Sequence, residues 1–231
     1  MGIIYAIVFY LQRLRYQKQL RAIEVQKKLQ DERERISRDL HDNVGTQLSL
    51  ISNNIDWVTR PLKELSEKEK NTQLEYISNT SRDVIATLRE TIWAINKSSI
   101  GLEEFSDKLK AHIQKQIALT PEVKFFCHEK INHAVELSPS ETLNLFRICQ
   151  EAVANSLKYS ECTKLNVTLE TFSENKFMIQ VSDNGKGFSN ENNNEEHYGI
   201  SNMQFRAKEI GAELSVNSSS AGTIIEIRKD E

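Results

Sequence analysis

Residues 35–48 read RISRDLHDNVGTQL, and they form the centre of the first element that the sequence predicts. Around them, apolar residues from Ile36 to Val58 recur at the three- and four-residue spacing of one helical stripe. Between about residues 12 and 59 only Gly45 disfavours a helix, and a glycine inside a helix costs about 1 kcal/mol relative to alanine. A helix that serves only packing has little use for His41, Asp42 and Gly45 at its centre. The pattern therefore singles out His41 as a candidate reactive group, and a structural role is the alternative for a single histidine in a helix.

A second apolar stripe follows after Pro61 and a polar run, and it extends from Leu74 to Ile95. Two long amphipathic helices joined by a short polar turn predict a helical hairpin. One hairpin buries its stripes poorly, whereas two hairpins make a four-helix bundle, so we expect a homodimer. A monomeric hairpin that packs on the rest of the chain is the alternative.

Composition indicates a core-forming chain: 39% of its 231 residues are hydrophobic, 27% are charged, and the net charge is −3. That charge gives no reason to expect direct binding to nucleic acid. Residues 1–11 carry no charge, and four basic residues follow by position 21. The apolar run is about half the roughly 20 residues that a spanning helix needs, and basic residues mark a cytoplasmic flank. We interpret residues 1–11 as the end of a transmembrane helix, with a packed dimer segment as the alternative.

The second half has a different pattern, with predicted strands at VKFFCHE (residues 123–129), KLNVTLETF and KFMIQVSDNG, and two more around a serine-rich turn near residue 219. A helix is expected over SPSETLNLFRICQEAVANSLKYS, with Ser138 or Ser140 as its cap, and another over about residues 200–210. Helices against one face of a mixed sheet predict an α+β sandwich.

Three short segments of this half carry polar residues and glycines in a suggestive order. EAVANSLKYS (residues 151–160) places an acid, an amide and an ammonium on one helix face. DNGKGF (residues 183–188) follows a strand with two glycines, which let the backbone approach a ligand closely. YGISNMQFRA (residues 198–207) puts a glycine at an expected helix start, where free N–H groups favour an anion. Each segment alone also fits a plain role: a solvated face, a hairpin turn and a helix cap.

Together and in this order, the three segments resemble the N, G1 and G2 boxes of the GHKL (Bergerat) ATP-binding fold found in histidine kinases, DNA gyrase and MutL. The stretches ERERISRDLHDNVGTQL, LRETIWAI and FRICQEAVANSLKYS further resemble sensor histidine kinases that pair with response regulators of the NarL/LuxR type. The resemblance covers about residues 33–228. It implies an ATP-dependent protein-histidine kinase of two-component signal transduction.

The resemblance also implies a set of nucleotide-binding residues. Asn155 would supply an oxygen ligand to Mg²⁺, which bridges the ATP phosphates, and Glu151 would position the metal or its water. Asp183 would accept a hydrogen bond from the adenine amino group, and residues 188–198 would form a lid. The other residues that the resemblance assigns to the cofactor are Lys158, Gly185, Gly187, Gly199 (as the start of a phosphate-facing helix) and Thr223.

In the implied reaction, His41 attacks the γ-phosphate, and Asp42 accepts the proton that sets the imidazole tautomer. The phosphoryl group then passes to an aspartate of the response regulator. In many relatives a glutamine stands five residues after the histidine and aligns a water that dephosphorylates the regulator. Thr46 holds that position here, and its hydroxyl can also orient water, so phosphatase activity is a weaker expectation.

The predicted organisation is an apolar segment (1–11), a signalling helix (12–32), a dimerisation and phosphotransfer domain (33–98), a connector (99–120) and an ATP-binding catalytic domain (121–231). The catalytic region is expected in the cytoplasm, attached to the inner membrane through the N-terminal segment. Two alternatives remain at this stage: a GHKL-type ATPase or kinase without histidine phosphotransfer, and a dimeric scaffold with a degenerate ATP site.

Overall fold

The computed structural model describes residues 2–59, 67–188 and 194–230; some side chains within its helices, including those of residues 38–44, 46 and 47, lie outside the description. The chain divides into two units, residues 1–98 and 99–231. The first unit is helical, and the second combines a sheet with helices. The predicted fold class, a helical region followed by an α+β domain, is confirmed.

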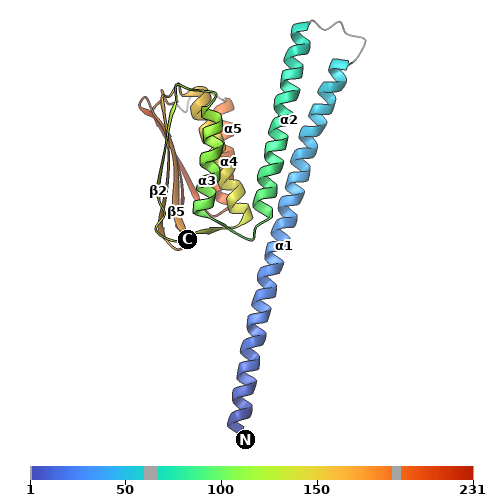
Figure 1. Ribbon diagram of the computed structural model, residues 1–231, viewed down its shortest axis with the longest axis vertical. Helices are drawn as coiled ribbons and strands as arrows, with labels where there is room; N and C mark the ends of the chain where they lie inside the picture. Colours follow the sequence, from blue (N-terminus) through green and yellow to red (C-terminus); the bar gives the residue numbers. More distant parts are fainter. Residues whose placement is uncertain (1, 60–66, 189–193, 231) are drawn as a thin grey trace. The chain divides into compact units, whose positions relative to one another are not determined.

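The first unit consists of two long helices that pack along one another as a hairpin (Figure 1), α1 (Gly2–Thr59) and α2 (Glu67–Ile95). Ile36 and Val84, one from each predicted stripe, are buried. Leu48, Leu74 and Ile92 belong to the same stripes, yet each remains about half exposed. A single hairpin therefore covers only part of its two apolar stripes.

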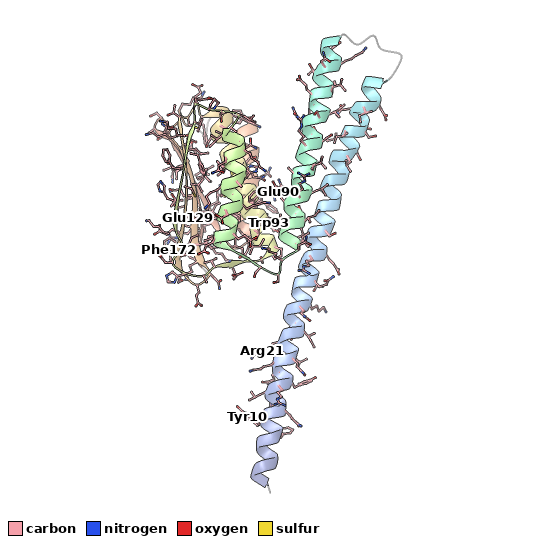
Figure 2. All side chains as sticks on the ribbon, in the orientation of Figure 1. Tyr10, Arg21, Glu90, Trp93, Glu129 and Phe172 are labelled. Atoms are coloured by element: carbon pink, nitrogen blue, oxygen red, sulfur yellow. The ribbon has the colours of Figure 1, made fainter. Side chains whose placement is uncertain are left out.

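In the N-terminal part of α1, residues 9–21 are exposed. Tyr10 and Arg21 project outward from the helix (Figure 2), and Tyr10 is 62% exposed. Over residues 2–59, 67–188 and 194–230, no helix combines the length and apolar content that membrane crossing requires.

The second unit contains a five-stranded mixed sheet. Its strands lie in the order β2 (Lys124–Lys130), β4 (Lys164–Ser173), β5 (Lys176–Asp183), β7 (Gly222–Lys229) and β6 (Glu213–Ser219). β2 pairs in parallel with β4, and the other neighbours are antiparallel. Buried residues alternate with half-buried ones along β4 and β5, which is the period of a sheet with one face on a core. The helices of this unit lie on one face of the sheet (Figure 1).

Helix α4 (Pro139–Tyr159) begins at a capping box that the sequence contains. The Ser138 Oγ accepts a hydrogen bond from the Glu141 backbone N–H at 3.3 Å, and the Glu141 carboxylate accepts one from the Ser138 N–H at 2.7 Å. These bonds satisfy two of the free N–H groups at the helix start, so Ser138 rather than Ser140 is the cap. α4 packs against α5 (Asn194–Glu209).

Helix α3 (Leu102–Ile117) lies inside the stretch that the sequence suggested as a connector. Its buried residues include Leu102, Phe105, Leu109 and Ile113, and the Phe105 ring packs edge to face against Phe146 of α4 at 6.2 Å. Just before it, β1 (Ile100–Gly101) pairs antiparallel with β3 (Glu136–Leu137). Residues 100–117 thus fold with the sheet unit.

Replacing Phe105 with alanine tests how strongly α3 is anchored. We expect Phe105→Ala to lower the free energy of unfolding by about 3–5 kcal/mol, because it opens a cavity beside Phe146. The measurement is urea denaturation followed by circular dichroism. Leu119→Ala is the matched control: Leu119 lies just after α3 and is 81% exposed, so its loss should change stability by less than about 0.5 kcal/mol. Equal effects of the two changes would contradict the anchoring.

Candidate functional site

A pocket lies where the C-terminal end of α4, the end of β5 and the start of β7 meet α5. It brings together all three polar segments that the sequence singled out, which are far apart along the chain. Its lining residues are Ala152, Asn155, Ser156, Tyr159, Ser160, Asp183, Lys186, Gly187, Phe188, Ile200, Met203, Thr223 and Ile225.

Asp183 is the buried acid of this pocket. Its Oδ1 accepts hydrogen bonds from the backbone N–H groups of Gly185 at 2.8 Å and Thr223 at 3.4 Å, and its Oδ2 accepts one from the Ser156 hydroxyl at 2.7 Å. A carboxylate has about four acceptor positions, and these described donors occupy three of them. Since Asp183 lines the pocket, the remaining position can accept a hydrogen bond from a ligand N–H.

The loop after Asp183 follows a tight path that glycine permits. Gly187 has φ of +63°, and a Cβ there would lie 2.1 Å from the Ser219 carbonyl oxygen. The Lys186 N–H donates to the Ser160 carbonyl at 2.8 Å, and the Phe188 N–H donates to Ser218 Oγ at 2.9 Å. The loop therefore lies against both α4 and β6. Beyond Phe188, residues 189–193 of the predicted lid lie outside the described residues.

Glu151 and Asn155 lie together on α4, as their spacing predicts. The Asn155 Nδ2 donates to Glu151 Oε1 at 3.3 Å. Lys158, predicted on the same face, is exposed and does not line the pocket. Asn155 lines the pocket and offers its amide oxygen as a hard ligand there, and Glu151, which does not line the pocket, holds its carboxylate against the Asn155 amide nitrogen. Such a pair suits Mg²⁺, which takes one or two protein ligands and completes its shell with phosphates and water.

Gly199 requires a correction. The sequence suggested that it begins a helix, but α5 begins at Asn194, so Gly199 is its sixth residue. A Cβ at Gly199 would lie 2.6 Å from Glu151 Oε1. Gly199 therefore lies close to the end of the Glu151 side chain, and the last five residues of the predicted lid are helical.

Several residues that contribute to the pocket were not among the predicted site residues. Ser156 donates to Asp183, and Ser218 Oγ contacts Thr223 Oγ1 at 3.1 Å while it accepts from Phe188. Met203 and Ile200 of α5 supply apolar lining. Only Ser156 could have been found from the sequence, because a serine directly after Asn155 comes to lie beside the ligand-facing turn of α4.

His41, Asp42 and Thr46 belong to α1, and their side chains lie outside the described residues. The backbone around them is helical, including Gly45, whose carbonyl accepts a hydrogen bond from Ser49 Oγ at 2.8 Å. A Cβ at Gly45 would meet no described atom within 4 Å. Packing within the described part of the chain therefore does not require this glycine.

Comparison with known proteins gives two family matches in chain order. Residues 32–99 match the HisKA_3 model, described as histidine kinase, and residues 140–231 match the family of histidine kinase-, DNA gyrase B- and HSP90-like ATPases. The sensor protein VraS of Staphylococcus saprophyticus is 31% identical over 211 residues, and that of Staphylococcus epidermidis is 32% identical over 217 residues. Each alignment covers 89% of this chain, and the chain spans 57% of the relative's length.

Solved structures show the same fold. The histidine kinase AdeS of Acinetobacter baumannii aligns with a TM-score of 0.50 at 12% identity, over 81% of this chain and 96% of that one. The blue-light activated histidine kinase of Erythrobacter litoralis EL346 aligns with a TM-score of 0.52 at 17% identity, over 74% of this chain and 63% of that one. With a histidine kinase helical region, an ATPase domain behind it and sensor proteins as relatives, this chain belongs to the sensor histidine kinase family.

Proposed function

We propose that the chain is a two-component kinase that phosphorylates itself on His41 from Mg-ATP and then passes the phosphoryl group to an aspartate of a NarL/LuxR-type response regulator. The observation that carries the proposal is the buried acid Asp183 with one acceptor position toward a pocket that Asn155 also lines. An adenine amino group can donate to that position. The family matches support the same reading.

The proposed roles follow from this geometry and from the chemistry of each group. Bound Mg²⁺ would neutralise phosphate charge, with Asn155 as its protein ligand and Glu151 as the residue that positions it. Lys158 would contribute a positive charge near the phosphates. One ring nitrogen of His41 attacks the γ-phosphorus, the bond from that phosphorus to its bridging oxygen breaks, and ADP leaves. The proton on the other ring nitrogen passes to Asp42.

The decisive experiment labels the protein with γ-labelled ATP and Mg²⁺ beside a His41→Gln variant. We expect acid-labile label on the wild type and none on His41→Gln, because phosphohistidine is the proposed product. Nucleotide binding by both proteins is the control. Label on both would place the acceptor elsewhere, and label on neither, with ATP bound, would favour the ATPase or scaffold alternatives.

We propose that the chain dimerises with a second copy of itself. The two hairpins would form a four-helix bundle that covers the exposed residues of the apolar stripes on α1 and α2. Leu48, Leu74 and Ile92 are 51%, 52% and 53% exposed in one hairpin. The regulator would dock on the same bundle near His41, and Thr46 would orient a water for dephosphorylation there.

A charge on the open stripe should dissociate the dimer. We expect Leu74→Glu to be monomeric at micromolar concentration in sedimentation velocity, because burying an unpaired carboxylate costs several kcal/mol. Asn79→Glu adds the same charge to α2 off the stripe and should remain dimeric. A dimeric Leu74→Glu would contradict the proposed interface.

We propose that the N-terminal part of α1 attaches the cytoplasmic catalytic region to the inner membrane. Its uncharged first eleven residues are followed by Arg13, Arg15, Lys18 and Arg21, and basic residues beside an apolar segment favour anionic lipid by about 1 kcal/mol each. The full chain should cosediment with vesicles that contain phosphatidylserine, and replacing the four basic residues with glutamine should reduce binding. Equal recovery with and without vesicles would contradict the attachment.

A further inference from the structure

Ser218 of β6 and Thr223 of β7 lie opposite each other across the β6–β7 hairpin. They are direct partners in the register of the two strands, and their hydroxyl oxygens lie 3.1 Å apart. Thr223 is only 8% exposed, and it lines the pocket beside Asp183. A hydrogen bond between two hydroxyls is an ordinary way to stabilise a strand pair, so its meaning depends on what else the two hydroxyls contact.

A third segment of the chain supplies the next contact. The Phe188 backbone N–H, in the loop that follows β5, donates to Ser218 Oγ at 2.9 Å. Among the described residues, Thr223 is the only other partner of the Ser218 hydroxyl, and Ser218 is the only partner of the Thr223 hydroxyl. The three groups therefore form one chain of hydrogen bonds, which leads from the loop backbone through two hydroxyls to the pocket.

The direction of the bond between the two hydroxyls decides what Thr223 presents to a ligand. A hydroxyl has one donor proton and two acceptor lone pairs. If Thr223 donates to Ser218, only lone pairs of Thr223 remain for the pocket, and the Ser218 proton has no acceptor in the described part of the chain. If Ser218 donates to Thr223, the Ser218 proton is satisfied and the Thr223 proton remains for a ligand.

The contact with Phe188 favours the second direction. A hydroxyl that accepts a hydrogen bond is polarised and becomes a better donor, because successive bonds in a chain strengthen one another. The backbone N–H of Phe188 can only donate, so it fixes Ser218 as an acceptor on that side. The Ser218 proton is then directed toward the Thr223 oxygen.

With this direction, the pocket presents an acceptor and a donor next to each other. The Thr223 N–H donates to Asp183 Oδ1 at 3.4 Å, so the carboxylate and the Thr223 residue are neighbours in the fold. The open acceptor position of Asp183 suits a ligand amino group, and the Thr223 proton suits a ligand acceptor beside it. Adenine carries this complementary pair on its Watson–Crick edge, as the amino group and the ring nitrogen N1.

We propose that Ser218 is a positioning residue for base recognition. Held by the Phe188 N–H, it donates to Thr223, so that the Thr223 proton is directed to N1 of the adenine, either directly or through one water. This rests on the proposed function, because it takes ATP as the ligand of the pocket. Ser218 acts through Thr223 and adds a second determinant of base specificity to the carboxylate of Asp183.

The test uses two ATP analogues, each of which lacks one group of the base edge. In 1-deaza-ATP a C–H replaces N1, and in purine riboside triphosphate a hydrogen replaces the amino group. In calorimetric titrations of the full chain with Mg²⁺ present, the wild type should bind ATP about 10-fold more tightly than 1-deaza-ATP, because that analogue leaves the Thr223 donor unpaired.

Ser218→Ala should reduce this preference for ATP over 1-deaza-ATP to about threefold or less, because the Thr223 proton is no longer directed to N1. The preference for ATP over purine riboside triphosphate reports on Asp183 and should stay within about twofold of the wild-type value, since that carboxylate keeps its own donors. A loss of structure would lower both preferences together, whereas the proposed role lowers only the first.

Three further variants connect the effect to the hydroxyls. In a Thr223→Val background, Ser218→Ala should cause no further change, because residues that act through one contact are not additive. Ser218→Cys retains a weak donor, so it should show a smaller loss, and it carries the test if Ser218→Ala does not fold. Ser215→Ala is the matched control: Ser215 is an exposed serine of the same strand, and both preferences should keep their wild-type values.

An unchanged preference for ATP over 1-deaza-ATP in Ser218→Ala would overturn the proposal, as would an equal fall in both preferences or a further loss in the Thr223→Val background. Equal binding of ATP and 1-deaza-ATP by the wild type would overturn it as well, while the nucleotide site would stand. Failure of the proposed function looks different. A wild type that binds no ATP would overturn both proposals, and one that binds ATP without labelling His41 would leave the affinity ratios to decide the role of Ser218.

Discussion

The buried carboxylate of Asp183 is the constraint on which the rest of the pocket depends. A buried acid must be hydrogen-bonded, since burying it without partners costs several kcal/mol. Its donors come from three separate segments: Ser156 of α4, Gly185 of the following loop and Thr223 of β7. The β5–β7 pairing sets Ser182 opposite Ile224, which brings Asp183 beside Thr223. The packing of α4 on the sheet brings the Ser156 hydroxyl to the Asp183 carboxylate.

This convergence requires backbones to approach closely around the acid. A Cβ at Gly222 would lie 2.0 Å from the Asp183 carbonyl oxygen, so β7 can begin beside Asp183 only with glycine there. Gly187 meets the same demand against β6, because a Cβ there would lie 2.1 Å from the Ser219 carbonyl oxygen. These two glycines therefore shape the backbone around Asp183, the acid that we propose recognises the base.

Periodicity and local turn chemistry predicted much of this fold from the sequence. The stripes of the hairpin, the capping box of α4 and the alternation of β4 and β5 depend on near neighbours, which the sequence contains. Helix α3 was missed because Gly101 provides no side-chain cap before it. The start of α5 was predicted at Gly199 and lies at Asn194. The prediction was wrong because a glycine often marks a helix boundary, and the neighbour of Gly199 in the fold, Glu151, is distant in sequence. The hydrogen bond from the Phe188 N–H to Ser218 Oγ likewise arises only from tertiary packing.

The central claim is that Asp183 offers its free acceptor position to an exocyclic amino group, and its most direct test compares two nucleotides. Inosine triphosphate differs from ATP by an oxygen in place of that amino group. Its base therefore places a hydrogen-bond acceptor, and no donor, against the acceptor oxygen of Asp183. By calorimetric titration, ATP should bind about 100-fold or more tightly than inosine triphosphate, and Asp183→Asn should largely remove the difference. Equal affinities for the two nucleotides in the wild type would contradict the account.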